Sequence, residues 1–172
     1  GCITLWRDFP EKIGEMSQCN VLIYDRQGYG KSCSFSYEKR ENTYMEDEAD
    51  ILNDLLDYWK LDQVILFGHS DGGSIALLMA AKFWAWAETW NKKAFLSWNI
   101  EPFLSKIQCP SLIIQGENDE YGSIKQVESI VEQVSGKVEK YMIPAIGHTP
   151  HKEATEKVLT KTTAFIKTLF YF

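Results

Sequence analysis

The residues that could do chemistry are clearest in the pentapeptide Gly-His-Ser-Asp-Gly at positions 68–72. The apolar run 63–67 before it predicts a buried strand, and the small residues of 73–81 predict a helix. This strand–turn–helix would lift the Ser70 hydroxyl to the helix N-terminus, where developing negative charge is favoured. We expect a β-carbon at either glycine to collide with the neighbouring strand or helix. The simpler interpretation is a structural turn with a serine N-cap.

A serine hydroxyl becomes a good nucleophile only with a base within hydrogen-bond reach, and that base needs an acceptor that fixes its tautomer. The sequence contains 3 histidines. His69 lies inside the turn and faces the wrong way to take the proton, and His151 is expected at the surface. His148, in a loop after a predicted strand, is therefore the candidate base. Asp119, in the loop after the preceding predicted strand, is the candidate acceptor.

The elements that must position these side chains alternate between strands and helices along the chain. Strands are predicted at 21–24, 63–67, 111–115 and 138–143, and helices near the N-terminus and at 43–59, 73–81, 123–134 and 153–170. The alternation predicts an α/β fold with a mostly parallel sheet flanked by helices. Loops after parallel strands meet at one edge of the sheet, so Ser70, Asp119 and His148 should face the same edge.

Length and composition bound the class of protein. The 172 residues suffice for one well-buried core, and we expect a single domain over 1–172. Hydrophobic residues make up 45% and charged residues 24%, as is typical of a soluble globular protein. The net charge of −6 argues against binding to nucleic acid or to an anionic membrane. The partner we expect is a small-molecule substrate, and the oligomeric state is left open.

The cellular location follows from what the sequence lacks. No apolar run reaches the roughly 18 residues that a membrane helix needs, and the N-terminus shows no signal-peptide pattern. The 4 cysteines lie far apart without metal-ligand spacing, so we expect reduced thiols packed mostly in the core and no metal site. These observations predict a cytoplasmic protein.

A second distinctive stretch is rich in tryptophan. Trp84, Trp86 and Trp90 lie close together, within a segment at 83–108 that could be the remnant of a lid. Such a density of aromatic side chains suits a lid or pocket wall over an apolar ligand. Packing of the same rings in the core is an equally good interpretation.

Four stretches together resemble the α/β-hydrolase superfamily, in particular its single-domain esterase and C–C-hydrolase-like branch. They are Tyr-Asp-Arg-Gln-Gly-Tyr-Gly-Lys-Ser at 24–32, Gly-His-Ser-Asp-Gly-Gly at 68–73, Gly-Glu-Asn-Asp at 116–119 and Gly-His-Thr-Pro-His at 147–151. The resemblance implies that Ser70 is the nucleophile, His148 the general base and acid, and Asp119 its orienting carboxylate. The backbone N–H of Asp71 would be one donor of the oxyanion hole.

The same resemblance assigns other residues and shows two departures. Asp25 matches a loop-bracing aspartate, and Glu117 and Glu120 are weaker substitutes for Asp119. The family has a strand and an oxyanion loop before its first helix, whereas this chain starts at the tail of such a loop. Family members also carry a further strand and a helical lid between nucleophile and acid. We therefore expect segments to be missing before Gly1 and around residue 82.

The function that these residues predict is that of a serine hydrolase without a cofactor. Ser70 would attack an ester-like carbonyl, an acyl-enzyme would form, and water would release the acid. Acyl transfer, C–C bond hydrolysis and amide cleavage remain open, because the lid that selects substrates is barely represented. The alternatives are a catalytically impaired α/β-hydrolase-fold protein that binds a ligand, and a protein that self-associates through exposed tryptophans or unpaired sheet edges.

Overall fold

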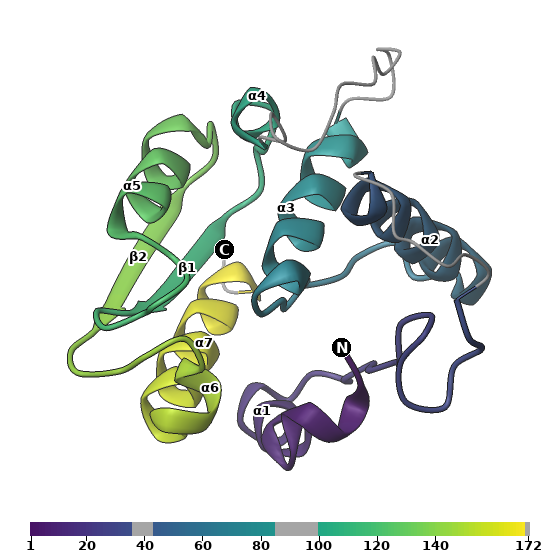
Figure 1. Cartoon of the computed structure of the whole chain (residues 1–172), viewed down its shortest axis with the longest axis horizontal. Helices are drawn as coiled ribbons and strands as arrows, with labels where there is room; N and C mark the ends of the chain where they lie inside the picture. The colour runs from purple at the N-terminus through teal and green to yellow at the C-terminus, as the bar shows by residue number, and fades with distance from the viewer. Residues whose placement is uncertain (36–42, 85–99, 171–172) are drawn as a thin grey trace. The chain divides into compact units, whose positions relative to one another are not determined.

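The computed structural model describes residues 1–35, 43–84 and 100–170 (Figure 1). The chain forms two compact units. The first comprises Gly1–Phe35, Pro110–Val131 and Val138–Phe172. The second comprises Ser36–Cys109 and Glu132–Lys137. The single-domain organisation expected from the sequence stays a prediction.

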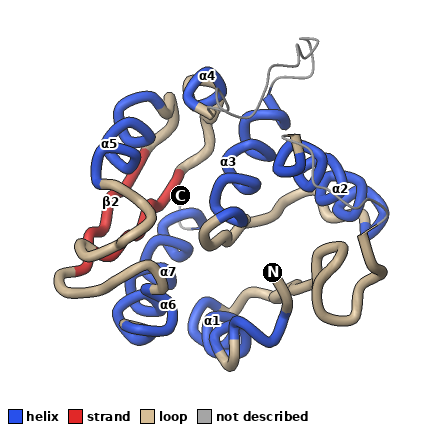
Figure 2. The backbone as a smooth tube through the Cα atoms, in the orientation of Figure 1, coloured by secondary structure: helices blue, strands red, loops and turns tan. Residues whose placement is uncertain are grey.

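The first unit is built around a parallel pair of strands, drawn in red in Figure 2. Its elements are η1 (Ile3–Trp6), α1 (Phe9–Ser17), β1 (Ser111–Gly116), β2 (Val138–Ile143), α6 (Pro150–Glu153) and α7 (Thr155–Phe170), and α5 (Ile124–Gln133) connects the strands. The register runs from Ser111 opposite Val138 to Gly116 opposite Ile143. Both strands therefore end at the same edge, as parallel strands joined by a crossover helix must. The α/β class with a parallel sheet flanked by helices is confirmed.

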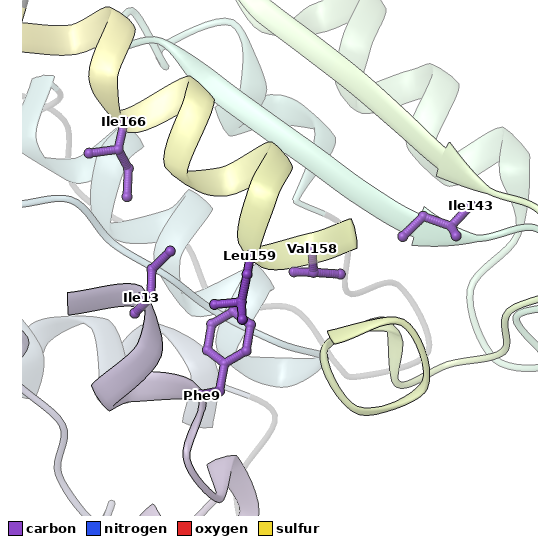
Figure 3. Close-up of a cluster of buried hydrophobic side chains, with 6 residues drawn as sticks. All are labelled: Phe9, Ile13, Ile143, Val158, Leu159 and Ile166. Atoms are coloured by element: carbon purple, nitrogen blue, oxygen red, sulfur yellow. The ribbon is translucent and has the colours of Figure 1, made fainter. Parts of the chain in front are cut away.

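Apolar side chains from α1, β2 and α7 form the core of the first unit (Figure 3). The cluster comprises Phe9, Ile13, Ile143, Val158, Leu159 and Ile166. In α7, Val158, Leu159 and Ile166 recur at helical spacing, so one stripe of that helix is buried. This packing anchors the C-terminal end of β2, from which the loop that carries His148 begins.

The second unit is helical among the residues that the structure describes, with α2 (Tyr44–Trp59), α3 (Asp71–Trp84) and α4 (Glu101–Leu104). Helices α2 and α3 pack against each other through a cluster that comprises Ala49, Leu56, Ile75, Leu78 and Met79. The helices expected at 43–59 and 73–81 are confirmed, and α3 is longer than the second prediction. Periodicity located these helices because an apolar stripe is a local signal.

Two of the four predicted strands are wrong. Residues 21–24 and 63–67 have no regular secondary structure, whereas the strands expected at 111–115 and 138–143 are present as β1 and β2. A strand is defined by backbone hydrogen bonds to a neighbour, and in the described part of the chain β1 and β2 form the one sheet. Val64 and Ile65 are also exposed rather than buried. An apolar run therefore predicted burial that the structure does not show.

No helix among the described residues combines the length and the apolar character that a transmembrane span requires.

Candidate active site

Ser70 lies in the second unit, at the turn that opens α3. Its backbone is left-handed, with φ 55°, which is uncommon for a residue that is not glycine. Gln18 and Lys60 also have positive φ, but each of them ends a helix, where this conformation is ordinary. At Ser70 the conformation instead precedes a helix. It is the strained turn that the Gly-x-Ser-x-Gly pattern predicts.

Steric contact explains one of the two glycines of the turn. A β-carbon at Gly68 would overlap the carbonyl group of Gly72, so the turn can form only with glycine at position 68. A β-carbon at Gly72 would meet no heavy atom within 4 Å outside its own helix and chain neighbours. The expectation that both glycines are sterically required is therefore wrong for Gly72, because its Cα faces open space.

The turn feeds directly into the hydrogen bonds of α3. The Ser70 carbonyl accepts bonds from the N–H groups of Gly73, at 2.8 Å, and Ser74, at 3.3 Å. Ser70 thus occupies the N-cap position, and Asp71 is the first residue of the helix. The first N–H groups of a helix have no partner within the helix itself, which is the geometry that an oxyanion donor needs.

Asp119 and His148 lie in the first unit and are bonded to each other. The imidazole Nδ1 of His148 lies 3.0 Å from Oδ1 and 3.1 Å from Oδ2 of Asp119. The side chains are 7% exposed for Asp119 and 24% exposed for His148. Asp119 follows β1 and His148 follows β2, so the parallel register brings the two loops to one edge. Glu117 and Glu120, the weaker substitutes for Asp119, are exposed.

The environment of Asp119 favours its charged form. Burial by itself raises the pKa of the carboxyl, but the hydrogen bonds from the Gly122 and Tyr121 N–H groups and from His148 outweigh it, and the pKa is lowered. Both backbone N–H groups donate to Oδ1 at 2.8 Å. The carboxylate is therefore ionised at neutral pH and can accept the proton on Nδ1. In that tautomer of the neutral imidazole, the other ring nitrogen carries the lone pair.

The two loops are held together by backbone contacts next to this pair. The Glu117 N–H donates to the Ile143 carbonyl at 3.0 Å, and the Asn118 N–H donates to the Ile146 carbonyl at 2.9 Å. A β-carbon at Gly116 would overlap the Ile146 carbonyl, so glycine is needed for this close approach.

Two residues that touch the His148 loop were missed from the sequence. The Tyr121 ring packs edge-on against the imidazole, with ring centroids 4.8 Å apart. The Glu153 carboxylate accepts hydrogen bonds from residues on both sides of His148. The available signal for Glu153 was its position one helical turn after Thr149, where a carboxylate can reach back to an N-cap. Tyr121 carried no comparable signal.

Asp25 braces a loop, as the resemblance implied. Its carboxylate accepts hydrogen bonds from the N–H groups of Ile3, at 2.7 Å, and Lys31, at 2.9 Å. The bond from Lys31, then that from Ile3, lowers the pKa of the carboxyl. A β-carbon at Gly30 would overlap this carboxylate, which accounts for the glycine there.

His151 and the cysteines differ from expectation. His151 is 7% exposed, because its ring packs against Trp6 and Phe9 at centroid distances of 4.8 and 6.2 Å. The expected surface position is therefore wrong. Cys33 is exposed and Cys2, Cys19 and Cys109 are half-buried, so none of the four is fully buried, although Cys19 packs against the core of the first unit. Within the described ranges, no group of three or more His, Cys, Asp or Glu side chains is arranged to hold a metal ion.

The remaining sequence-predicted site residues are the tryptophans. Trp84 is the last residue of α3. Trp86 and Trp90 lie outside the described residues, and so does most of the segment 83–108. The lid therefore stays a prediction. Ser70 belongs to one unit and the Asp119–His148 pair to the other. The approach of the Ser70 hydroxyl to the His148 imidazole is therefore a proposal.

Comparison with known proteins agrees with the resemblance of the sequence to the α/β-hydrolase superfamily. The family model described as Serine aminopeptidase, S33, matches residues 15–97. The α/β hydrolase domain-containing protein aho-3 of Caenorhabditis elegans is 28% identical over 157 residues, covering 79% of this chain and 46% of the relative. The human α/β hydrolase domain-containing protein 17B is 28% identical over 153 residues, covering 79% and 52%. The chain thus spans about half the length of these curated relatives.

Solved structures agree on the fold. MGS-M2, an α/β-hydrolase enzyme from a Medee basin deep-sea metagenome library, has a TM-score of 0.75 at 19% identity, covering 99% of this chain and 85% of that one. A thermophilic esterase from Thermogutta terrifontis has a TM-score of 0.74 at 16% identity, covering 96% and 86%. The family model, the curated relatives and the solved structures all indicate the α/β-hydrolase superfamily.

Proposed function

We propose that the chain is a serine hydrolase that acts on an ester-like small molecule, with Ser70 as nucleophile, His148 as base and Asp119 as its orienting carboxylate. The Ser70 oxygen would form a bond to the carbonyl carbon while its proton passes to His148. Collapse of the tetrahedral intermediate would then release the alcohol, which takes that proton. Water, activated by the same imidazole, would release the acid and restore the serine.

The observation that carries the proposal is the Asp119–His148 pair. An ionised carboxylate at 3.0 Å from Nδ1 selects the tautomer in which the opposite ring nitrogen accepts a proton. It also stabilises the imidazolium that forms during attack. An imidazole prepared in this way is what a serine nucleophile needs.

Two further observations support the roles of Ser70 and Asp71. A left-handed backbone at a non-glycine residue costs on the order of 1–3 kcal/mol and persists where the surroundings enforce it, commonly at functional sites. The N–H of Asp71, at the start of α3, would donate to the developing oxyanion. Such an interaction typically raises kcat by a factor of about 10²–10³.

The substrate class is a further part of the proposal. The esterase among the similar structures favours an ester-like carbonyl, and the hydrolase family model favours a small-molecule substrate. The description of that model as a serine aminopeptidase leaves amide cleavage open. Esterase-like chemistry needs no cofactor, because the serine, the imidazole and the oxyanion donors supply every step. A carboxylesterase-like activity and a cytoplasmic location stay predictions.

Labelling with a fluorophosphonate probe tests the proposal, because the probe reacts with an activated serine. We expect the wild-type chain to be labelled and Ser70→Ala to remain unlabelled. Ser74→Ala, which changes a serine one turn further along α3, is the matched control and should be labelled like wild type. Absence of labelling in folded wild-type protein would contradict the proposal and support the alternative of a catalytically impaired ligand-binding protein.

A further inference from the structure

The Glu153 carboxylate holds the backbone of the His148 loop on both sides of the histidine. Oε2 accepts a hydrogen bond from the Gly147 N–H at 2.9 Å. Oε1 accepts one from the Thr149 N–H at 2.9 Å and one from the Thr149 hydroxyl at 2.8 Å. Both oxygens of one side chain are thus used by the two residues that flank His148.

These bonds constrain the direction in which the imidazole points. The Thr149 N–H belongs to the peptide group that follows His148, so holding it limits rotation about the ψ bond of His148. The Gly147 N–H belongs to a peptide group on the other side, whose Ile146 carbonyl is already bonded to Asn118. One held peptide group therefore follows His148 directly, and a second, between Ile146 and Gly147, lies one residue before it. The ring of His148 lies against Asp119, with Nδ1 3.0 Å from Oδ1.

The charge on Glu153 is kept by the same contacts. The Gly147 N–H bond is the largest cause that lowers the pKa of the Glu153 carboxyl, followed by the Thr149 hydroxyl and N–H. The negative charge of Asp119 acts in the opposite direction and raises it. Glu153 is exposed, and its carboxylate contacts the backbone N–H groups of Gly147 and Thr149, so its effect on the ring passes through these two peptide groups.

We propose that Glu153 is a positioning residue for the hydrolytic reaction: by holding the N–H groups of Gly147 and Thr149, it keeps the His148 ring oriented on Asp119. This inference rests on the proposed function, since it assigns the effect to catalysis by His148. A carboxylate that merely closed the start of α6 would instead affect stability alone. The two roles differ in what they do to turnover and to the ring.

Three variants separate these roles. Glu153→Ala removes all three acceptor contacts, and Glu153→Gln keeps one acceptor oxygen without the charge. Glu156→Gln makes the same chemical change at an exposed residue of α7, three positions further along the chain. With p-nitrophenyl acetate as substrate, we expect Glu153→Ala to lower kcat by about 10- to 100-fold with KM unchanged, because a misdirected base impairs the chemical step. The kcat of Glu153→Gln should lie between those of wild type and Glu153→Ala, and the kcat of Glu156→Gln should match that of wild type.

The His148 ring gives a second readout that needs no substrate. The proton on Nδ1, hydrogen-bonded to Asp119, should give a downfield resonance in the proton NMR spectrum of wild type and Glu156→Gln. We expect this resonance to weaken or broaden in Glu153→Ala and to recover partly in Glu153→Gln, as the ring loses and regains its fixed orientation. Far-ultraviolet circular dichroism checks that each variant is folded, and the milder Glu153→Gln decides the question if Glu153→Ala unfolds.

The two proposals fail in different ways. Folded wild-type chain that neither hydrolyses the ester nor takes a fluorophosphonate label would overturn the proposed function, and the Nδ1 resonance would still decide whether Glu153 orients His148. Active wild type together with a Glu153→Gln variant of unchanged kcat and unchanged Nδ1 resonance would overturn the role of Glu153. A loss of stability in Glu153→Gln without a change in kcat or in the Nδ1 resonance would also overturn the role of Glu153.

Discussion

Each unit fixes its own candidate catalytic residues by different means. In the first, Asp119 and His148 follow paired strands, and backbone N–H groups and carboxylates fix both loops. In the second, Ser70 follows a segment without regular structure, and the turn is defined by a glycine contact and by the start of α3.

This difference separates electrostatic from steric positioning. The Asp119–His148 pair depends on hydrogen bonds to charged groups, which are stronger than neutral ones and respond to a change of a single charge. The Ser70 turn depends on the absence of a β-carbon at Gly68, which no change of pH or salt can alter. Variants that remove a charge should therefore act on the Asp119–His148 pair and not on the Ser70 turn. An added methyl group should act on the turn at Gly68 and, in the first unit, on the approach of the two loops at Gly116.

Among the substitutions that test this difference between the units, the largest expected effect comes from the charge of Asp119. In Asp119→Asn the amide can donate to Nδ1, which selects the wrong tautomer of His148, and we expect kcat for p-nitrophenyl acetate to fall by about 10⁴-fold. Glu117→Gln, an isosteric change two residues away on an exposed side chain, is the control and should keep the wild-type rate. The reverse result, with Glu117→Gln slow and Asp119→Asn unaffected, would move the orienting carboxylate to Glu117.

The Ser70 turn gives a matched pair of glycine substitutions. Gly68→Ala places a methyl group against the Gly72 carbonyl, and we expect the free energy of unfolding to fall by about 1–3 kcal/mol, with loss of fluorophosphonate labelling. Gly72→Ala enters open space in a helix, so stability should be unchanged or rise by up to about 1 kcal/mol.

Urea denaturation followed by circular dichroism measures both values. Equal destabilisation by the two substitutions would show that the steric account of the turn is wrong.

The sequence predicted the helices, β1, β2 and the pairing of Asp119 with His148, because these depend on local periodicity and on motifs with fixed spacing. It failed at 21–24 and 63–67, where apolar content was read as a strand although strand formation depends on a neighbour that local sequence does not specify. Tertiary packing also decided the burial of His151 against Trp6 and Phe9.

The fine structure of the site was beyond sequence reasoning for a related reason. Glu153 and Tyr121 act through contacts that exist only once the loops after β1 and β2 are folded. The open space at Gly72 is likewise a property of the folded turn. Residue types indicated what chemistry is possible, and the fold determined which side chains support it.

The smallest expected effect is on the pH dependence of stability. The pKa of Glu153 is lowered in the folded chain, mainly by the Gly147 N–H, so the unfolded chain binds this proton first as the pH falls. The contribution of Glu153 is therefore fully present above its ordinary pKa of 4.5 and is lost as the pH falls through the lower, folded value. Glu153→Gln should show a shallower loss of stability than wild type below about pH 5.

Urea midpoints measured between pH 6 and pH 3.5 test this slope. Glu156→Gln serves as the control and should follow wild type. Parallel curves for wild type and Glu153→Gln would mean that the Glu153 carboxylate is not held by the loop.

The proposed function requires that Ser70 and His148 act together in one reaction. The most direct test is a double-mutant cycle on p-nitrophenyl acetate hydrolysis with Ser70→Ala, His148→Ala and the double variant. Each single substitution should lower kcat by about 10⁶-fold, and the double variant should be no slower than either, because a nucleophile and its base are lost together. Losses that multiply in the double variant, or a His148→Ala enzyme that keeps its rate, would contradict the account.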